Sequence, residues 1–231
     1  MKTVLIDVDG TISNSMPGIR AGLLEALDSL GVPHPDEEFL ATIAGPPMVE
    51  TLAALGLSDE QVDAAFAVYM NQQRMGGWQM TSMYPQWPEI LDGWRTDGLQ
   101  LATATTKGEY FAAKVLEMFE LTDCFAAIGA ASNDGTRRQK ADVIAYALAQ
   151  LGIAAGPDVL MIGDRRHDIE GARAHGIDTV LVSWGYGLPE EHAMATAVVH
   201  SPEELDAYVR QWAGLPIAVQ SAASQSEGAH A

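Results

Sequence analysis

The stretch Thr3-Val4-Leu5-Ile6-Asp7-Val8-Asp9-Gly10-Thr11 joins a short apolar run to two carboxylates and a glycine. An apolar run that ends at a turn signal is typical of a buried strand, here parallel and central in a sheet. Because side chains alternate along a strand, Asp7 and Asp9 are expected to leave the sheet on the same side. Gly10 allows the backbone to turn sharply or to approach a ligand closely.

Two carboxylates at the end of a strand have several interpretations. They can hold a hard cation such as Mg²⁺ through oxygen, or divide the roles of nucleophile and proton carrier. An acidic turn without a chemical role is the alternative. A calcium loop of the EF-hand type does not fit, because Thr11 and Gly18 occupy positions where that motif needs an acidic or amide ligand and the closing Glu.

The composition describes an ordinary globular protein. The chain has 231 residues, 48% of them hydrophobic and 19% charged, which is enough for one large domain or for a domain with an insert. No apolar run approaches the length of a membrane span, and the N-terminus lacks the pattern of a signal peptide. The only cysteine, Cys124, excludes an intrachain disulfide. These features predict a cytoplasmic protein without a membrane partner.

The charge restricts the possible partners. A formal net charge of −18 argues against nucleic acid as a partner. Nearly half of the 13 basic residues nevertheless fall in three short segments. This clustering predicts a local anion site in a protein whose overall negative charge repels anions. The basic residues of these segments are Lys107, Arg137, Arg138, Lys140, Arg165 and Arg166.

Helical patterns without strand character follow the first strand. Residues 15–83 contain helical spacing in Pro17–Leu30 and Met48–Leu55 and a helix start at Ser58, and the block is too long for an ordinary crossover. We therefore predict an inserted all-helical domain at 15–83, a core domain made of 1–14 and 84–213, and a disordered tail at 214–231.

Strand and helix patterns alternate after residue 84, which predicts an α/β fold with a doubly wound parallel sheet. The expected strands are Leu99–Thr105, Phe125–Ala130, Val159–Gly163, Thr179–Trp184 and a short edge strand at 198–200. The expected helices are Trp87–Asp97, Glu109–Phe119, Gln139–Leu151, Asp168–His175 and Glu203–Trp212.

Polar residues follow two of these strands. The hydroxyl of Thr105 and the turn amides of Thr106 and Lys107 can bind a phosphoryl oxygen. Asp164 and Asp168 can face one site across a helical turn, although Asp168 also suits the first turn of a helix.

These elements in this order, Asp-x-Asp-Gly-Thr, a strand-end Thr, a downstream Lys and Gly-Asp-x-x-x-Asp, resemble the haloacid dehalogenase superfamily over about residues 2–212. The insert is similar to the cap of the branch that contains phosphoglycolate phosphatases. The resemblance implies a Rossmann-like core with an inserted helical cap. It also implies that Asp7 is the nucleophile, that Asp9 is the general acid and base, and that Thr105 and Lys140 steady the transferring phosphoryl group.

The same resemblance implies a Mg²⁺ cofactor held by Asp7, Asp164, Asp168 and the backbone carbonyl of Asp9. The residues expected to bind the phosphate are Gly10, Thr11, Thr105, Thr106 and Lys140. Two features of the insert are open. Gly45-Pro46-Pro47 is either a specificity loop or an inter-helix turn, and Arg20 either binds a substrate carboxylate or lies on the surface.

The implied function is Mg²⁺-dependent hydrolysis of a small phosphomonoester through an aspartyl-phosphate, with phosphoglycolate as the first candidate. A nucleoside 5′-monophosphate phosphatase and a phosphomutase are the alternatives. The insert and the Asp-x-Asp on the first strand disfavour a non-catalytic receiver-like module, and Asp9 disfavours a dehalogenase. The sequence does not predict the oligomeric state.

Overall fold

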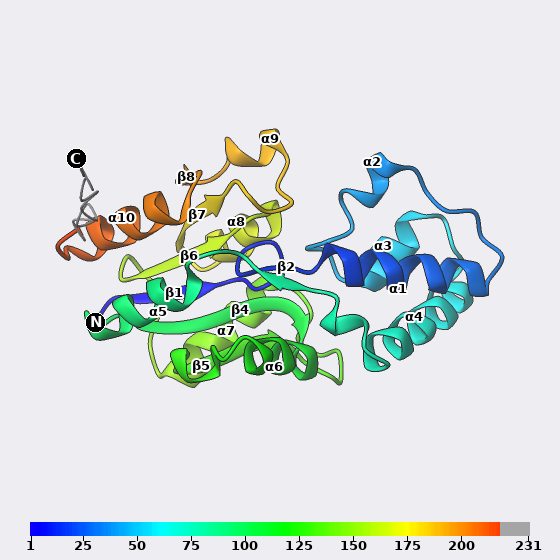
Figure 1. Ribbon diagram of the computed structural model, residues 1–231, viewed down its shortest axis with the longest axis horizontal. Helices are drawn as coiled ribbons and strands as arrows, with labels where there is room; N and C mark the ends of the chain where they lie inside the picture. The colour runs from blue at the N-terminus through cyan, green and yellow to red at the C-terminus, as the bar shows by residue number, and fades with distance from the viewer. Residues whose placement is uncertain (218–231) are drawn as a thin grey trace, which may run out of the picture.

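The computed structural model describes residues 1–217, and these contain a six-stranded parallel sheet in the order β5-β4-β1-β6-β7-β8 (Figure 1). Its strands are β1 (Thr3–Ile6), β4 (Gln100–Gly108), β5 (Ala127–Ala131), β6 (Val159–Gly163), β7 (Asp178–Val182) and β8 (Ala197–Val199). The last residue of β1, Ile6, pairs with Thr103 on one side and Ile162 on the other. The carboxyl ends of the three central strands therefore meet at one edge, and the predicted α/β fold with a parallel sheet is confirmed.

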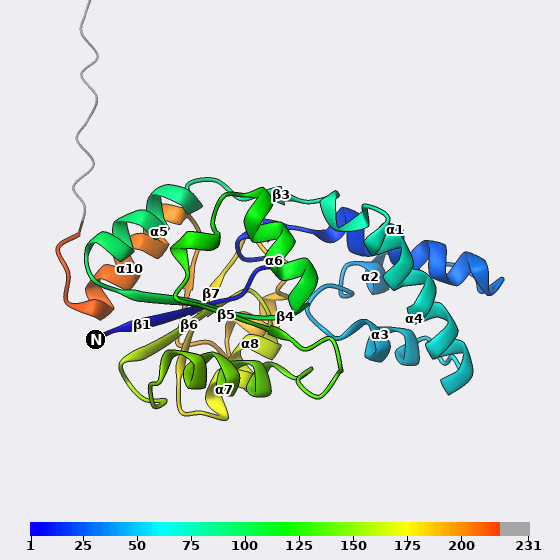
Figure 2. The same ribbon diagram turned by 90° about the horizontal axis from the view of Figure 1, so that it is seen from below.

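Helices cover both faces of the sheet, as Figure 2 shows. They are α5 (Trp87–Thr96), α6 (Glu109–Met118), α7 (Lys140–Leu151), α8 (Arg166–Arg173), α9 (Pro189–His192) and α10 (Pro202–Ala213). Val4 and Ile6 pack with α5, α6 and α10 in one cluster, whereas Leu5 packs with α7 and α8 in the other. This alternation explains why β1 is apolar throughout: both of its faces are buried.

Four helices between β1 and α5, called the insert helices here, lie beyond the carboxyl edge of the sheet (Figure 1). They are α1 (Met16–Ser29), α2 (Glu37–Leu40), α3 (Met48–Ala54) and α4 (Asp59–Arg74), followed by a short 3₁₀ helix, η1 (Gly77–Gln79). They enclose a hydrophobic cluster of their own, with Leu23, Leu27 and Leu52 at its centre. A reciprocal capping box between Ser58 and Gln61 starts α4 as the sequence indicates.

One part of the sequence-based prediction for this block is wrong. Residues 36–83 were expected to contain no strand, but β3 (Ser82–Met83) pairs antiparallel with β2 (Ser13–Asn14). Both strands have two residues, which is too short for an alternating pattern to be visible. They join the segments that enter and leave the insert helices.

Other boundaries and expectations differ in smaller ways. Helix α8 begins at Arg166, two residues before the expected start, because Asp168 caps it from its first turn. The division into two domains stays a prediction, and residues 218–231 of the expected disordered tail lie outside the described residues. Within residues 1–217, no helix combines the length and apolar character needed to cross a membrane.

Candidate active site

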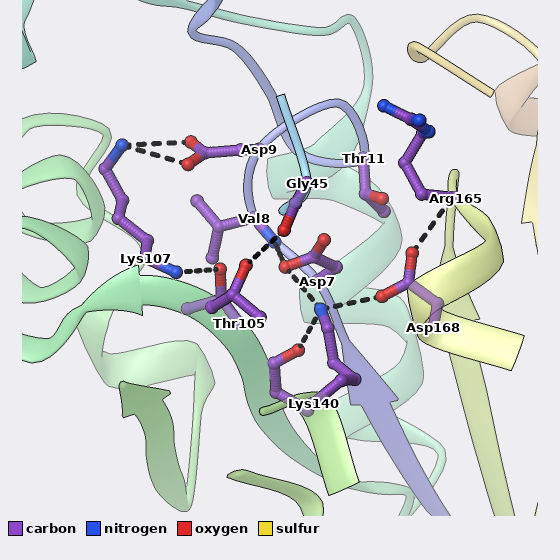
Figure 3. Close-up of polar contacts among 12 residues, drawn as sticks. Asp7, Val8, Asp9, Thr11, Gly45, Thr105, Lys107, Lys140, Arg165 and Asp168 are labelled. Carbon is purple, nitrogen blue, oxygen red and sulfur yellow. Dashed lines mark hydrogen bonds and ion pairs between the residues drawn. The ribbon is translucent and has the colours of Figure 1, made fainter. Parts of the chain in front are cut away.

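The carboxyl edge of the sheet gathers polar side chains from β1, β4 and β6 and from the first turn of α7 (Figure 3). Asp7 follows β1 directly, and its N–H donates to the carbonyl of Ile162 at 2.9 Å. Thr105 belongs to β4, and Asp164 follows β6. Residues that are far apart in the sequence therefore meet here because their strands are neighbours in the sheet.

Lys140 is the central cation of this group. Its Nζ lies 3.0 Å from Asp7 Oδ1 and 2.6 Å from Asp168 Oδ1, and it donates to the carbonyl of Ala104 at 2.8 Å. Burial alone would lower the pKa of Lys140, but the charges of Asp168 and Asp7 outweigh that effect and raise it. Lys140 is therefore a permanent positive charge under the site.

Three buried carboxylates converge beside Lys140. Asp7, Asp164 and Asp168 each offer an oxygen, and these atoms lie within 4.8 Å of one another. Burial, opposed by Lys140, raises the pKa of Asp7 to about 6. Burial and the charges of Asp168 and Asp7 raise the pKa of Asp164 well above its usual value. One lysine does not neutralise three carboxylates, so this all-oxygen donor set fits a hard cation.

Asp168 also organises the loop after β6. Its Oδ2 accepts the N–H groups of Asp164 and Arg165, each at 3.0 Å, while its Oδ1 faces Lys140. A side chain at Gly163 would collide with it, because an added Cβ would lie 2.2 Å from Asp168 Cγ. Asp168 therefore fixes the backbone of Asp164 and Arg165 at the end of β6.

Gly10 and Thr11 lie against Asp164. Gly10 has a φ of +85°, and a Cβ added there would lie 2.1 Å from Asp164 Oδ2. The hydroxyl of Thr11 is 3.5 Å from Asp164 Oδ1, and its carbonyl accepts the indole N–H groups of Trp87 and Trp184. These contacts pack the turn after β1 tightly against the loop after β6.

Asp9 lies outside the group of three carboxylates. Both of its oxygens are 3.1 Å from Lys107 Nζ, and both side chains are largely buried. Lys107 belongs to β4, and its N–H donates to Thr105 Oγ1 of the same strand at 3.2 Å. Lys107 was expected as one of the clustered basic residues and as a turn amide for a phosphoryl oxygen, but its ion pair with Asp9 was not predicted.

The insert helices contact the site through the segment 42–45. The hydroxyl of Thr106, predicted to bind phosphate, donates to the carbonyl of Gly45 at 2.9 Å. Arg165 Nη1 donates to the carbonyls of Thr42 and Ala44. No local pattern predicts these contacts, because they join segments more than 60 residues apart.

Arg165 is held by Glu191, a residue that no sequence motif indicated. The buried carboxylate of Glu191 accepts from Arg165 Nε at 3.0 Å and from Nη2 at 3.3 Å. In contrast, Arg20 pairs with Glu37 on the exposed surface of the insert helices. Of the two interpretations of Arg20, the structure favours the surface residue.

A cavity of about 720 Å³ lies beside Asp9 and Lys107, between β4, α6 and the insert helices. Thr106 lines it from β4, and the loop Gly45-Pro46-Pro47 lines it from the insert. A molecule in this cavity would contact Asp9 directly.

Comparisons with known proteins define the class of protein. The sequence model of the family of haloacid dehalogenase-like hydrolases matches residues 4–182. Since this match covers most of the chain, the chain belongs to that family.

Three relatives place the chain within the family. The tyrosine-protein kinase PtkA of Mycobacterium tuberculosis is 42% identical over 86% of this chain and 68% of its own length. The structure of PtkA covers 93% of this chain and 98% of its own, with a TM-score of 0.76 at 38% identity. A 5′-nucleotidase of Pseudomonas aeruginosa is 32% identical over 81% of this chain and 85% of its own.

Phosphoglycolate phosphatase 1 of Pseudomonas aeruginosa is 28% identical over 88% of this chain and 78% of its own. Together with the family match, this relative identifies a phosphoric monoester hydrolase of the branch that resembles phosphoglycolate phosphatases.

Proposed function

We propose that the chain hydrolyses a small-molecule phosphomonoester through a phosphorylated Asp7, with Mg²⁺ as cofactor. The observation that carries this proposal is the contact of Asp7 with Lys140 at 3.0 Å inside a group of three buried carboxylates. One lysine does not balance the negative charge of three carboxylates. A dianionic phosphoryl group beside them needs further positive charge.

In the first step, an oxygen of Asp7 attacks phosphorus, and the bond from phosphorus to the ester oxygen breaks. Asp9 delivers a proton to the departing oxygen, because it borders the cavity in which the leaving group would lie. In the second step, Asp9 takes a proton from water, which attacks phosphorus and releases phosphate from Asp7. Lys140 and Thr105 hold the carboxylate of Asp7 and the phosphoryl oxygens in place.

The carboxylates of Asp7 and Asp164 would hold the Mg²⁺, with the carbonyl of Asp9. Asp168 would join them directly or act by fixing Asp164, as its bonds to the N–H groups of Asp164 and Arg165 favour. When bound, Mg²⁺ would supply the positive charge that offsets these carboxylates and the phosphoryl oxygens.

The resemblance to phosphoglycolate phosphatases makes phosphoglycolate the first substrate to test. The name of PtkA describes transfer to tyrosine instead of water, and phosphomutases transfer to a second substrate hydroxyl. All of these reactions can use one phosphorylated carboxylate and differ in the acceptor. We propose water as the acceptor here, since the comparisons include phosphatases and a nucleotidase.

The test is acid quenching of the enzyme during turnover of a phosphomonoester, followed by mass spectrometry of the peptide that contains Asp7. We expect a phosphoryl group on Asp7 and release of inorganic phosphate, both lost in Asp7→Asn. Circular dichroism checks that this variant folds. Full activity in Asp7→Asn would contradict the proposal. Transfer of the γ-phosphoryl group of ATP to tyrosine, without release of inorganic phosphate, would favour the kinase reaction.

A further inference from the structure

The cavity beside Asp9 has aromatic walls on two sides. Phe66 and Tyr69 of α4 stack with their ring centroids 6.3 Å apart and their planes at 18°. Across the cavity, Tyr110 and Phe111 of α6 form an edge-to-face pair with centroids 5.2 Å apart. One wall therefore comes from the insert helices and the other from the helix that follows β4.

Apart from Ala131 of β5, the rest of the apolar lining comes from the insert helices and the segments that join them. These side chains are Ile19, Ile43, Pro46, Pro47, Met48, Val49 and Met70. A volume of about 720 Å³ lies within the range of roughly 300–1,000 Å³ found for sites of drug-sized ligands. The glycolate part of phosphoglycolate is much smaller than this space, and its carboxylate would gain little from apolar walls.

The charged residues of the cavity suit one end of a phosphomonoester. Lys107, Arg74 and Arg138 contribute three cations, against the single carboxylate of Asp9. In a chain of net charge −18, this local excess of positive charge attracts a phosphate dianion. The cavity thus combines three cations, which favour a phosphate, with aromatic walls that can hold the remainder of the molecule.

We propose that this chamber selects phosphomonoesters whose leaving group carries a planar aromatic ring, over phosphoglycolate. The inference rests on the proposed function, because it assumes hydrolysis at Asp7 with the leaving group beside Asp9. Rings bind between aromatic walls by stacking and by removing apolar surface from water. A nucleobase and a phenyl group share this chemistry.

The test compares 2-phenylethyl phosphate with ethyl phosphate, two alkyl esters whose leaving alcohols have similar acidity. The aromatic ring is then the main difference between them, and leaving-group chemistry is matched. We expect kcat/KM to be about ten- to a hundredfold higher for the phenyl ester. This factor corresponds to the free energy of stacking one base on an aromatic side chain. Equal values, or a higher value for phosphoglycolate than for the phenyl ester, would overturn the inference. Hydrolysis of none of the three would instead contradict the proposed function.

Variants locate the effect in the cavity. Phe66→Ala and Tyr110→Ala should each reduce the ratio of the two kcat/KM values by about tenfold, mainly through KM. Phe66→Leu keeps an apolar side chain in the insert cluster but removes the ring, and should act in the same direction if Phe66→Ala fails to fold. Val62→Ala is the matched control, because Val62 packs in the same cluster on α4 without lining the cavity. A ratio unchanged in every Phe66 and Tyr110 variant would overturn the inference.

Two further substrates separate the sources of the ring. Adenosine 5′-monophosphate presents a nucleobase, and free phosphotyrosine presents a phenol ester. Preference for either over phosphoglycolate supports the inference and names the source. Inhibition constants of 2-phenylethylphosphonate and ethylphosphonate give the same comparison without turnover, and equal constants would contradict it.

Discussion

Arg165 and Glu191 form a buried ion pair with two contacts, at 3.0 and 3.3 Å, beside the loop that carries Asp164. The remaining guanidinium nitrogen donates to carbonyls of the segment 42–45, so one side chain joins three separate parts of the chain. The backbone N–H of Arg165 also donates to Asp168. Arg165 therefore connects the three buried carboxylates of the site to the insert helices.

The first prediction concerns this pair. Glu191→Gln leaves the charge of Arg165 buried without its partner, and we expect the free energy of unfolding to fall by about 3–5 kcal/mol. Urea denaturation measures this change. The control is Glu170→Gln, which removes an exposed pair with Arg166 at 3.8 Å and should cost about 0–1 kcal/mol. Equal losses in the two variants would show that the buried pair has no special role.

The second prediction compares two glycines with positive φ. Gly10→Ala would place its Cβ 2.1 Å from Asp164 Oδ2, whereas Gly31→Ala, at a φ of +66°, meets nothing within 4 Å. We expect Gly31→Ala to cost about 1 kcal/mol through backbone strain alone. Gly10→Ala should cost more and also abolish phosphatase activity, because Asp164 must move. Activity and denaturation assays on both variants check this, and equal effects would argue against tight packing at Gly10.

The third prediction concerns Asp9 as the proton donor. Asp9→Ala should slow hydrolysis of an alkyl phosphate by about 10²–10⁴-fold, but slow p-nitrophenyl phosphate much less, since a good leaving group needs little protonation. The measurement is kcat for both esters in wild type and variant. Similar losses for the two esters would indicate that Asp9 has another role.

The fourth prediction concerns metal. The chelated protein should be inactive, and Mg²⁺ at a hundred times its dissociation constant should stabilise it by about 2.7 kcal/mol. Thermal unfolding measures the shift in Tm without turnover. Asp164→Asn should lose most of the shift, whereas Asp63→Asn, an exposed carboxylate on α4, should keep it. A shift of the same size in Asp164→Asn would place the ion elsewhere, and undiminished turnover in chelator would exclude the metal requirement.

The sequence predicted the parts of the fold that repeat a pattern. Buried parallel strands are continuously apolar, so the central strands were visible, and Thr105 and Asp164 could be placed at one edge by the topology alone. Strands β2 and β3 were missed because two residues, Ser13–Asn14 or Ser82–Met83, show no period.

The contacts within the site were less predictable than its members. Asp9 was expected to leave the sheet on the same side as Asp7, but the ion pair of its carboxylate with Lys107, 98 positions away, had no signal in the sequence. Arg165 belongs to a visible basic segment, whereas Glu191 has no local signal because its burial depends on the fold around α9. Pairings of this kind are decided by side-chain packing between distant segments, which spacing in one sequence does not encode.

The small ribbon of β2 and β3 has a consequence for how this protein can change. Ser13–Asn14 and Ser82–Met83 hold the two ends of the intervening polypeptide side by side. Closing a loop costs entropy that grows only slowly with length, and here the ends are already joined outside that loop. A change in the length of the intervening polypeptide should therefore cost little loop entropy, because its two ends stay joined whatever lies between them.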